Sequence, residues 1–292
     1  MRQGIESGTF VSNAGTLYVV ATPIGNLEDM TLRAARILAE VDLIAAEDTR
    51  HSGKLLKHFG IGTKTEALHE HNERSQVPRL IEILQAGKSI AFITDAGTPL
   101  VSDPGFHLVR SARQSGISVI PVPGACAAIA ALSAAGLPSD RFVFEGFPPA
   151  KSAARRAVFE ILRAEARTLI LYESPHRILE SLQDMAEVFG PERPAVLARE
   201  LTKQFETIHG GTLGELLEWV ERDAHQQLGE FVVLIHGVPR AEREAVDAEA
   251  ERILKILLEE LPVSQAVALA AKITGLKKNR LYEFALSFKP EH

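Results

Sequence analysis

Residues 89–105 read SIAFITDAGTPLVSDPG, and this stretch decides the fold. Its first six residues, SIAFIT, enclose a continuous apolar run at 90–93, which is typical of a strand buried on both faces of a parallel sheet. The next eleven, residues 95–105, hold two glycines, two prolines and two aspartates. An amphipathic segment at 106–115 follows and predicts a helix. A strand, a long polar loop and a helix in that order predict a βαβ unit whose loop is long enough to carry a function.

The same alternation extends on both sides of this stretch. Apolar runs rich in β-branched residues alternate with amphipathic segments. We expect strands at 16–21, 42–46, 89–94 and 118–122, and helices at 31–41, 74–86 and 106–115. Strands separated by helices pair in parallel, with helices on both faces of the sheet. Residues 16–122 are therefore predicted to form an N-terminal α/β domain.

A second series of strands and helices is expected in residues 123–238, which would form a second α/β domain. Its strands are predicted at 141–145, 168–172, 195–199 and 230–236, and its helices at 153–164, 177–189 and 212–222. A further strand candidate at 204–208 follows 195–199 closely. This closeness favours a hairpin, and therefore a mixed sheet.

The two ends of the chain differ from these domains in composition. Residues 1–15 are polar and rich in glycine and serine, so they are expected to form a flexible leader. Residues 239–250 follow a proline and carry dense charge with few large apolar side chains, so we expect a linker there. Three short helices are expected in residues 251–292, which would form a small helical extension.

The overall composition excludes several classes of protein. The chain has 292 residues, of which 46% are hydrophobic and 24% charged, and this globular composition argues against wholesale disorder. It has no apolar stretch near the roughly 20 residues of a membrane span and no signal-peptide pattern. A single cysteine, Cys126, excludes an internal disulfide framework. These features lead us to expect a cytoplasmic protein. We expect no metal site, because His69 and His71 lack an obvious further ligand.

Ligands of open parallel sheets bind beyond the carboxyl ends of the strands, where this chain has three conspicuous loops. The loop at 22–29 matches neither a dinucleotide fingerprint nor a nucleoside-triphosphate loop. Glu47, Asp48 and Arg50 follow the second strand, and Asp95 begins the loop after the third. The first two loops are also consistent with ordinary turns that cap helices, whereas the length of the third favours a function.

Small residues at 123–128 open a further predicted helix and would let a ligand approach its backbone amides. Cys126 lies among them with no base nearby in the sequence, so we interpret it as a packing residue rather than a nucleophile. Cations stand at two predicted helix starts, where they oppose the helix dipole. They are Lys151, Arg155, Arg156 and Arg177. Such cations indicate an anionic partner, although a solvated helix face explains them equally well.

Seven segments of this chain also carry a family resemblance. They are TPIGNLED at 22–29, AAEDTR at 45–50, DAGTP at 95–99, SDPG at 102–105, PGA at 123–125, YESPHR at 172–177 and RELTK at 199–203. In this order they resemble the tetrapyrrole-methylase superfamily of S-adenosylmethionine-dependent methyltransferases, and more closely its subgroup that acts on small-subunit ribosomal RNA. The first loop is glycine-rich in the wider superfamily, whereas Ala21, Thr22 and Pro23 stand here. This departure suits the ribosomal subgroup and argues against a corrin or porphyrin substrate.

The resemblance implies a two-domain α/β enzyme that binds S-adenosylmethionine between its domains and works as a homodimer. It implies transfer of a methyl group to the 2′-hydroxyl of a cytidine in 16S ribosomal RNA, either as naked RNA or in the assembled 30S subunit. The helical extension resembles the helix-turn-helix-like segment of this family. Carried over to matching positions, the cofactor contacts would be Pro23, Ile24, Asp95, Thr98, Cys126 and Ala127.

A ribose hydroxyl is a weak nucleophile, so a general base would raise the rate by roughly 10²–10⁴-fold. Loop position suggests Glu47 and His176 as the base, with Asp48 and Arg177 as further catalytic candidates. The RNA would be held by local cations, such as the five bases that stand against two acids in residues 268–292, even though the net charge is −6. The expected RNA contacts are Arg50, Lys151, Arg155, Arg156, Arg199, Lys203, Lys277, Lys278 and Arg280.

Two other functions remain open from the sequence. A small-molecule tetrapyrrole or corrinoid methyltransferase would share the cofactor site but would have no use for the basic helix starts or the terminal helices. A non-catalytic RNA-binding protein would use those cations and would not bind the cofactor.

Overall fold

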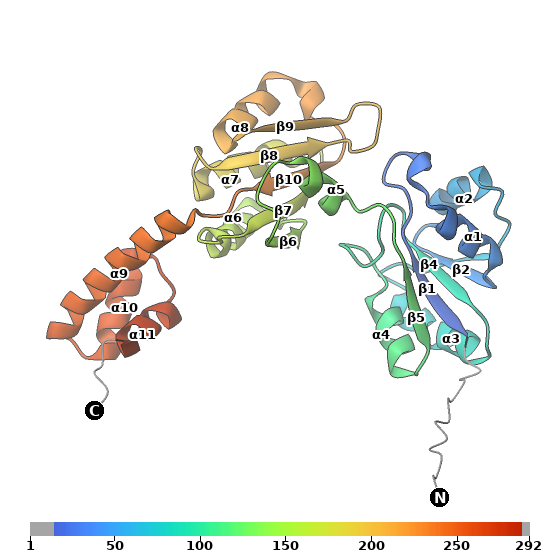
Figure 1. Cartoon of the computed structure of the whole chain (residues 1–292), viewed down its shortest axis with the longest axis horizontal. Helices are drawn as coiled ribbons and strands as arrows, with labels where there is room; N and C mark the ends of the chain where they lie inside the picture. Colours follow the sequence, from blue (N-terminus) through green and yellow to red (C-terminus); the bar gives the residue numbers. More distant parts are fainter. Residues whose placement is uncertain (1–14, 288–292) are drawn as a thin grey trace, which may run out of the picture.

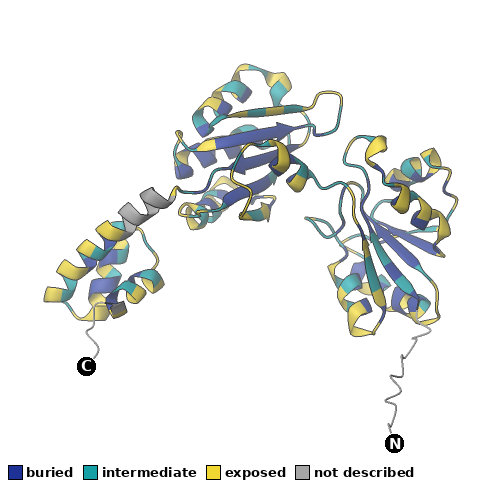
Figure 2. Ribbon diagram, viewed as in Figure 1, coloured by how far each residue is buried: buried dark blue, intermediate teal, exposed yellow. Residues whose placement is uncertain are grey.

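The computed structural model describes residues 15–287, except for the side chains of residues 240–247 and 287. Two α/β units follow one another along the chain, and a bundle of helices lies beyond the second unit, on the side away from the first (Figure 1). Buried residues concentrate in the two sheets (Figure 2). The expected leader lies outside the described residues, apart from Gly15.

The first sheet is parallel throughout, as the apolar runs predicted, with the strand order β3-β2-β4-β1-β5. Its strands are Thr16–Val20 (β1), Leu43–Ala46 (β2), Thr65–Ala67 (β3), Ile90–Ile93 (β4) and Ser118–Val122 (β5). The helical elements are Leu27–Asp29 (η1), Leu32–Glu40 (α1), Thr49–His58 (α2), Glu73–Gln85 (α3) and Phe106–Gln114 (α4). One core cluster joins the sheet to α1 and α2, and another joins it to α3 and α4, so both faces of the sheet are covered.

The central strands β1 and β4 create the place where a ligand can bind. They are neighbours, but the chain leaves β1 towards β2 and leaves β4 towards β5, which lie on opposite sides of this pair. Connections that diverge from adjacent parallel strands leave a crevice at their carboxyl ends. The loops 22–29 and 95–105 both start at this crevice.

The second sheet is mixed, as predicted, with the strand order β6-β7-β10-β8-β9. Its strands are Phe142–Gly146 (β6), Thr168–Glu173 (β7), Pro194–Arg199 (β8), Thr207–Thr212 (β9) and Phe231–Ile235 (β10). The pair β6–β7 is parallel, and β8–β9 is the expected antiparallel hairpin. The helical elements are Ala127–Ala134 (α5), Ser152–Leu162 (α6), Ile178–Phe189 (α7), Leu213–Arg222 (α8) and Ala224–Gln227 (η2).

Alternation along β7 decides which side chains face the first domain. Leu169 and Leu171 pack with α6, α7 and α8 on one face of the second sheet, whereas Ile170 and Tyr172 pack on the other face with α5. Successive side chains of a strand point to opposite faces. Tyr172 and Glu173, adjacent in the sequence, therefore point to different sides at the end of β7.

The structure differs from the sequence expectation in three segments. The predicted series had no counterpart for α2 and β3, and most of the expected linker at 239–250 is helical, because α9 begins at Arg240. The predicted strand at 204–208 lies later, at Thr207–Thr212. Alanine, glutamate and arginine are good helix formers, so a charged segment rich in them forms a helix rather than a linker.

The C-terminal bundle consists of Arg240–Glu260 (α9), Val263–Thr274 (α10) and Lys278–Ser287 (α11). Its small core includes Leu254, Val267 and Leu281. Gly275 has φ 72° and ends α10, since a left-handed conformation costs glycine little. None of the helices in residues 15–287 is long and apolar enough to cross a membrane.

Candidate functional site

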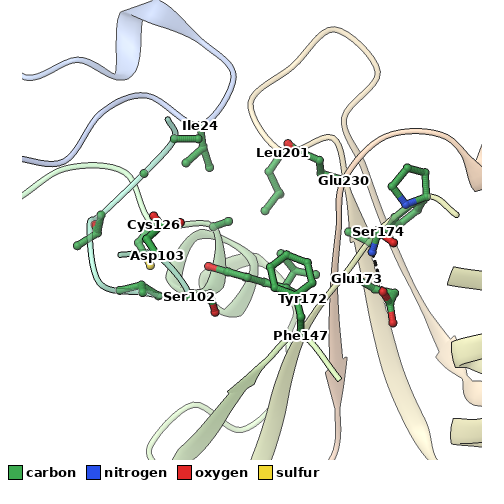
Figure 3. A pocket seen from close by; sticks show the side chains of 18 residues that line it. Ile24, Ser102, Asp103, Cys126, Phe147, Tyr172, Glu173, Ser174, Leu201 and Glu230 are labelled. Atoms are coloured by element: carbon green, nitrogen blue, oxygen red, sulfur yellow. Dashed lines mark hydrogen bonds between the residues drawn. The ribbon is translucent and has the colours of Figure 1, made fainter. Parts of the chain in front are cut away.

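A cavity of about 310 Å³ lies where the two α/β units meet (Figure 3). Its first-domain wall comprises Ile24 and residues 96–98 and 101–103. Its second-domain wall comprises Cys126, Ala127, Phe147, residues 172–175, Leu201 and residues 230–232. The first wall is built from the loops after β1 and β4, so the cavity lies at the crevice between these strands.

Two loops are joined to make the first-domain wall. The Thr22 and Gly97 backbones exchange hydrogen bonds of 2.9 Å and 3.1 Å, and the Thr98 hydroxyl donates to the Ala125 carbonyl at 2.9 Å. Gly97 has φ 81°, and a Cβ there would lie 3.1 Å from the Ile24 side chain. A side chain at this position would be strained and crowded, so glycine allows the close approach.

The remainder of the loop is held in an uncommon conformation. Leu100 has φ 70° and Ser102 has φ 64°, although neither is glycine. Gly105, with φ 115°, brings the backbone so close to β4 that a Cβ would lie 2.2 Å from the Phe92 ring. Non-glycine residues with positive φ persist only where the surroundings enforce them, and such residues cluster at functional sites. The loop therefore places Asp103 on the cavity wall at a cost in backbone strain.

Three carboxylates gather on the first-domain side, and one of them, Asp103, lines the cavity. Burial raises the pKa of Asp103 to about 6, the Thr94 hydroxyl lowers it, and the charges of Glu47 and Asp95 raise it further. Burial also raises the pKa of Glu47, which accepts a hydrogen bond from the Asp95 amide at 3.3 Å. In the described part of the chain, no three His, Cys, Asp or Glu side chains stand close enough to hold a metal ion.

Tyr172 crosses the cavity from the second domain towards the first-domain loops (Figure 3). Its hydroxyl accepts a hydrogen bond from the Ala128 amide at 3.1 Å, at the start of α5. Burial raises the pKa of the Tyr172 phenol, and the neighbouring Cys126 thiol raises it further. The phenol therefore stays neutral at physiological pH and fixes the start of α5 beside the cavity.

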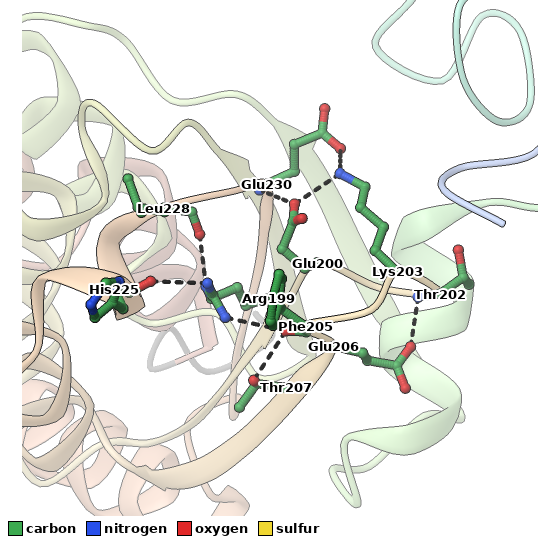
Figure 4. Close-up of polar contacts among 10 residues, drawn as sticks. All are labelled: Arg199, Glu200, Thr202, Lys203, Phe205, Glu206, Thr207, His225, Leu228 and Glu230. Carbon is green, nitrogen blue, oxygen red and sulfur yellow. Dashed lines mark hydrogen bonds and ion pairs between the residues drawn. The ribbon is translucent and has the colours of Figure 1, made fainter.

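Two glutamates of the second-domain wall are paired with cations, and the Glu173 side chain points to the side of the sheet opposite Tyr172. Glu173, whose side chain is fully buried, accepts from Arg177 at 2.8 Å, and Glu230 accepts from Lys203 at 2.7 Å. Lys203 also donates to Glu200 at 2.8 Å, so one ammonium group holds two carboxylates (Figure 4). These pairs fix the ends of β7, β8 and β10 around the cavity.

The structure brings four of the six predicted cofactor contacts to the cavity. Ile24, Thr98, Cys126 and Ala127 line it. Pro23 and Asp95 precede lining residues directly in the sequence but are not part of the lining. The Asp95 carboxylate instead accepts a hydrogen bond from the Asp48 amide at 3.2 Å.

Of the catalytic candidates, none lines the cavity directly. Asp48 caps α2 and pairs with Arg50 at 2.9 Å, and its pKa lies below the usual range because Arg50 holds it. His176 is exposed. Arg177 donates to the Glu173 carboxylate, the Ser174 hydroxyl and the Pro148 carbonyl. Its guanidinium is therefore engaged by acceptors within the protein.

Two of the predicted RNA contacts have buried side chains that are engaged within the protein. Arg155 is fully buried and pairs with Asp184 at 2.6 Å. Arg199 is 8% exposed, and its guanidinium donates to the carbonyls of Leu228, Phe205 and His225 (Figure 4). Cations at strand and helix ends of this domain thus satisfy the protein's own acceptors.

The other predicted RNA contacts retain some exposure. Arg50, Lys151, Lys277 and Lys278 are exposed, and Arg156, Lys203 and Arg280 are partly exposed. Lys277 and Arg280 line a second cavity, of about 860 Å³, between α11 and the ends of α6 and α7. The terminal helices therefore present cations next to the second domain.

Sequence reasoning missed Asp103, Phe147, Tyr172 and Leu201 as site residues. Three of them lie inside the quoted motifs SDPG, YESPHR and RELTK. The motifs carried the signal, but a motif does not say which of its side chains points to a cavity.

Two family matches cover nearly the whole described chain. Residues 16–217 match the tetrapyrrole (corrin/porphyrin) methylases, and residues 244–289 match the RsmI C-terminal HTH domain. The chain belongs to the tetrapyrrole methylase family. The first match spans both α/β units up to α8, and the second spans the helical bundle.

Curated relatives within this family are similar over almost their full length. A ribosomal RNA small subunit methyltransferase I of Pseudomonas aeruginosa is 62% identical over 94% of this chain and 98% of its own length. A protein of the same description from Escherichia coli O157:H7 is 57% identical over 94% of this chain and 96% of its own.

Solved structures of the family share the fold at low sequence identity. A uroporphyrin-III-C-methyltransferase from Thermus thermophilus has a TM-score of 0.54 at 24% identity, covering 76% of this chain and 94% of that one. The methyltransferase CobJ has a TM-score of 0.57 at 18% identity, covering 77% of this chain and 95% of that one. These likenesses concern the fold alone.

Proposed function

We propose that this chain transfers a methyl group from S-adenosylmethionine to the 2′-hydroxyl of a cytidine in 16S, small-subunit ribosomal RNA. The observation that carries the proposal is the cavity of about 310 Å³ at the crevice between β1 and β4. Four residues expected to contact the cofactor line it. The high identity to relatives described as ribosomal RNA small subunit methyltransferase I supports the substrate class.

The chemistry of the cavity walls fits S-adenosylmethionine. Ile24, Val101 and Leu201 provide apolar surface for an adenine, and Ala127 begins a helix whose backbone is accessible. Asp103 offers a carboxylate that pairs with no cation among the side chains that the structure describes, and the cofactor carries positive charge on its sulfonium and amino groups. When bound, the cofactor would supply a methyl group that needs no further activation.

The reaction depends more on positioning the acceptor hydroxyl than on activating the methyl donor. An in-line displacement requires the hydroxyl and the methyl carbon to be held collinear, and fixed walls provide this. Phe147 lines the cavity, is 53% exposed and contacts the Tyr172 ring edge-on, with 5.5 Å between the ring centroids. Unstacked RNA bases commonly stack on such rings.

Ribosomal RNA would approach over the exposed cations. Arg50, Lys151, Arg156, Lys203, Lys277, Lys278 and Arg280 remain the proposed phosphate contacts. We further propose that the enzyme is a homodimer and that its substrate places it in the cytoplasm. Naked RNA and the assembled 30S subunit are both substrates to be tested.

The proposal is tested with labelled S-adenosylmethionine and three acceptors: naked 16S RNA, isolated 30S subunits and a mixture of corrinoid precursors. We expect label in 2′-O-methylcytidine after nuclease digestion of the RNA, identified by mass spectrometry. Label in the corrinoid fraction alone would overturn the substrate assignment. Absence of cofactor binding by calorimetry would favour a non-catalytic RNA-binding protein instead.

A further inference from the structure

Two arginines near the starts of α3 and α4 differ from other exposed arginines of this chain. Arg74 and Arg110 are exposed, and neither pairs with a carboxylate among the side chains that the structure describes. By contrast, Arg36, Arg222 and Arg252 each lie 2.7 Å from a glutamate oxygen. Those three charges are compensated within the protein, whereas the charges of Arg74 and Arg110 remain available to an anionic ligand.

A buried carboxylate holds the starts of α3 and α4 side by side. Glu73 opens α3, and its side chain accepts a hydrogen bond from the Leu108 amide, in the first turn of α4, at 3.0 Å. Glu73 is 4% exposed, so this contact is shielded from water. Arg74 follows Glu73, and its Nε lies 3.5 Å from the Nε2 of His107, the residue before Leu108. The arginine of one helix is thereby placed against the ring of the other.

An exposed aromatic ring completes this group. Phe106 is 57% exposed, the guanidinium carbon of Arg110 lies 5.9 Å from its ring centroid, and the centroid of the His107 ring lies 5.4 Å from it, edge-on. We call Arg74, Phe106, His107 and Arg110 the α3–α4 patch. Cations beside an exposed ring suit single-stranded nucleic acid, because the cations hold phosphates and the ring stacks on a base. An acidic peptide would use the cations but has no flat base to cover the ring.

The α3–α4 patch lies at the same edge of the first sheet as the cavity. α4 begins at Phe106, three residues after Asp103 on the cavity wall, and α3 begins at Glu73, after β3 has ended at Ala67. Helices that follow parallel strands start at the carboxyl edge of the sheet, which is the edge where the crevice opens. RNA that places a ribose in the cavity therefore has the patch within reach on the first-domain side.

We propose that the α3–α4 patch binds a single-stranded segment of small-subunit ribosomal RNA beside the methylated nucleotide. Arg74 and Arg110 hold phosphates of this segment, and Phe106 stacks on one of its bases. The proposal rests on the function proposed above. It adds a first-domain surface to RNA contacts that were otherwise expected mostly in the second domain and the helical bundle.

The test measures binding of the full-length chain to labelled RNA over a range of salt concentrations. The probes are naked 16S RNA and isolated 30S subunits, and calorimetry follows S-adenosylhomocysteine binding in parallel. On the probe that the wild type binds more tightly, the double variant Arg74→Ala, Arg110→Ala should lose affinity roughly tenfold near physiological salt. The slope of log affinity against log salt should become shallower by about 1.4, or about 0.7 for each lost phosphate contact. Binding of S-adenosylhomocysteine should not change.

Two substitutions of Phe106 separate stacking from packing. Phe106→Leu keeps an apolar side chain but removes the flat ring, so it should lower RNA affinity about fivefold or more. Phe106→Tyr keeps the ring and should bind RNA as the wild type does. The slope against salt should stay unchanged in both variants, because neither removes a phosphate contact. Equal losses of affinity in both variants would show that the ring does not stack on a base, and the assignment of Phe106 would be wrong.

The double variant Arg33→Ala, Arg36→Ala is the matched control for charge. Both residues are exposed on α1, which packs on the opposite face of the first sheet from α3 and α4. This control also removes two positive charges, so a general effect of net charge would appear in it to the same extent. We expect wild-type affinity and slope. Equal losses in the two double variants would overturn the proposal.

The remaining outcomes separate the patch from the proposed function. Unchanged affinity and slope in the Arg74→Ala, Arg110→Ala variant would overturn the proposal. A change of oligomeric state in Phe106→Leu, measured by analytical ultracentrifugation, would also overturn it, because the patch would then be an interface between copies of this chain. If the wild type binds RNA but transfers no methyl group to it, the proposed function fails, and the binding measurements still decide the role of the patch. If it binds neither probe, both proposals fail.

Discussion

The two walls of the cavity treat carboxylates in opposite ways. On the first-domain side, burial raises the pKa values of Asp103 and Glu47. On the second-domain side, Glu173 and Glu230 each lie within 2.8 Å of a cation. An unpaired carboxylate with a raised pKa can exchange protons near neutral pH, whereas a paired one holds its surroundings in place. In the described part of the chain, the first-domain wall therefore presents an unpaired carboxylate to a ligand, whereas the ion pairs of the second domain hold the ends of its strands in place.

The strongest test of this contrast breaks a pair on the second-domain wall. Arg177→Met would leave the Glu173 carboxylate, whose side chain is fully buried, without its cation. Removing one partner of a buried ion pair costs about 3–5 kcal/mol, because the remaining charge is desolvated and uncompensated. We expect a loss of this size in the free energy of unfolding, measured by urea denaturation.

A matched control exists in the same domain. Arg222 and Glu218 form an ion pair at 2.7 Å with the same spacing of four residues, but their side chains are 78% and 63% exposed. Exposed pairs contribute about 0–1 kcal/mol, so Arg222→Met should change the free energy of unfolding by less than about 1 kcal/mol. Equal losses in both variants would show that the Glu173–Arg177 pair is not structural.

A substitution on the first-domain wall should raise the free energy of unfolding rather than lower it. The pKa of Asp103 is about 6 in the folded chain, against 3.8 for an unperturbed aspartate. Between these values the folded state keeps a proton that the unfolded state has lost, so stability falls as the pH rises through this window. Asp103→Asn should therefore raise the free energy of unfolding at pH 7 by about 1–2 kcal/mol, a discounted value because solvent screens this partly exposed carboxyl.

Urea denaturation at two pH values checks this prediction. At pH 7 the variant should be more stable than the wild type, and at pH 4 or below the two should converge, because Asp103 is then protonated in the folded state and increasingly in the unfolded state. A variant that is less stable than the wild type at pH 7 would contradict an unfavourable environment for this carboxylate.

Most of the fold could be predicted because burial leaves a periodic pattern. The strands β2, β4 and β10 are apolar along their whole length, and the sequence shows this directly. The missed helix α2 buries only Ser52 and Leu56, and the missed strand β3 has three residues, none fully buried. Elements that bury so little leave almost no pattern to find.

The site was less predictable, because charge partners come from distant parts of the chain. Arg155 looked like a contact for an anion at a helix start, but its partner Asp184 lies 29 residues later and removes it from the surface. Asp103 was passed over for a different reason. The cation of Glu173 stands only four residues later in the sequence, whereas nothing near Asp103 in the sequence indicates that its carboxylate faces the cavity.

The smallest expected effect concerns the place where the two walls touch. A Cβ on Gly25 would lie 2.4 Å from the Lys203 Cγ, 3.0 Å from the Thr202 hydroxyl and 3.1 Å from the Leu201 carbonyl. The Lys203 Cγ lies near the backbone and its ammonium is held by Glu200 and Glu230, so the Lys203 side chain must shift, and the Leu201 backbone must shift by a few tenths of an ångström. Because Leu201 lines the cavity, Gly25→Ala should weaken S-adenosylhomocysteine binding by about 0.5–1 kcal/mol, or about two- to fivefold.

A double-mutant cycle separates this contact from a general disturbance. Lys203→Ala removes the atom nearest to the new methyl group, so its effect and that of Gly25→Ala should be non-additive in calorimetry. Gly53→Ala is the control, since a Cβ there has no neighbour within 4 Å and alanine favours the helix α2. Strictly additive effects would mean that the loop after β8 does not rest on Gly25, and the paired charges of the second-domain wall would then position that wall without touching the first domain.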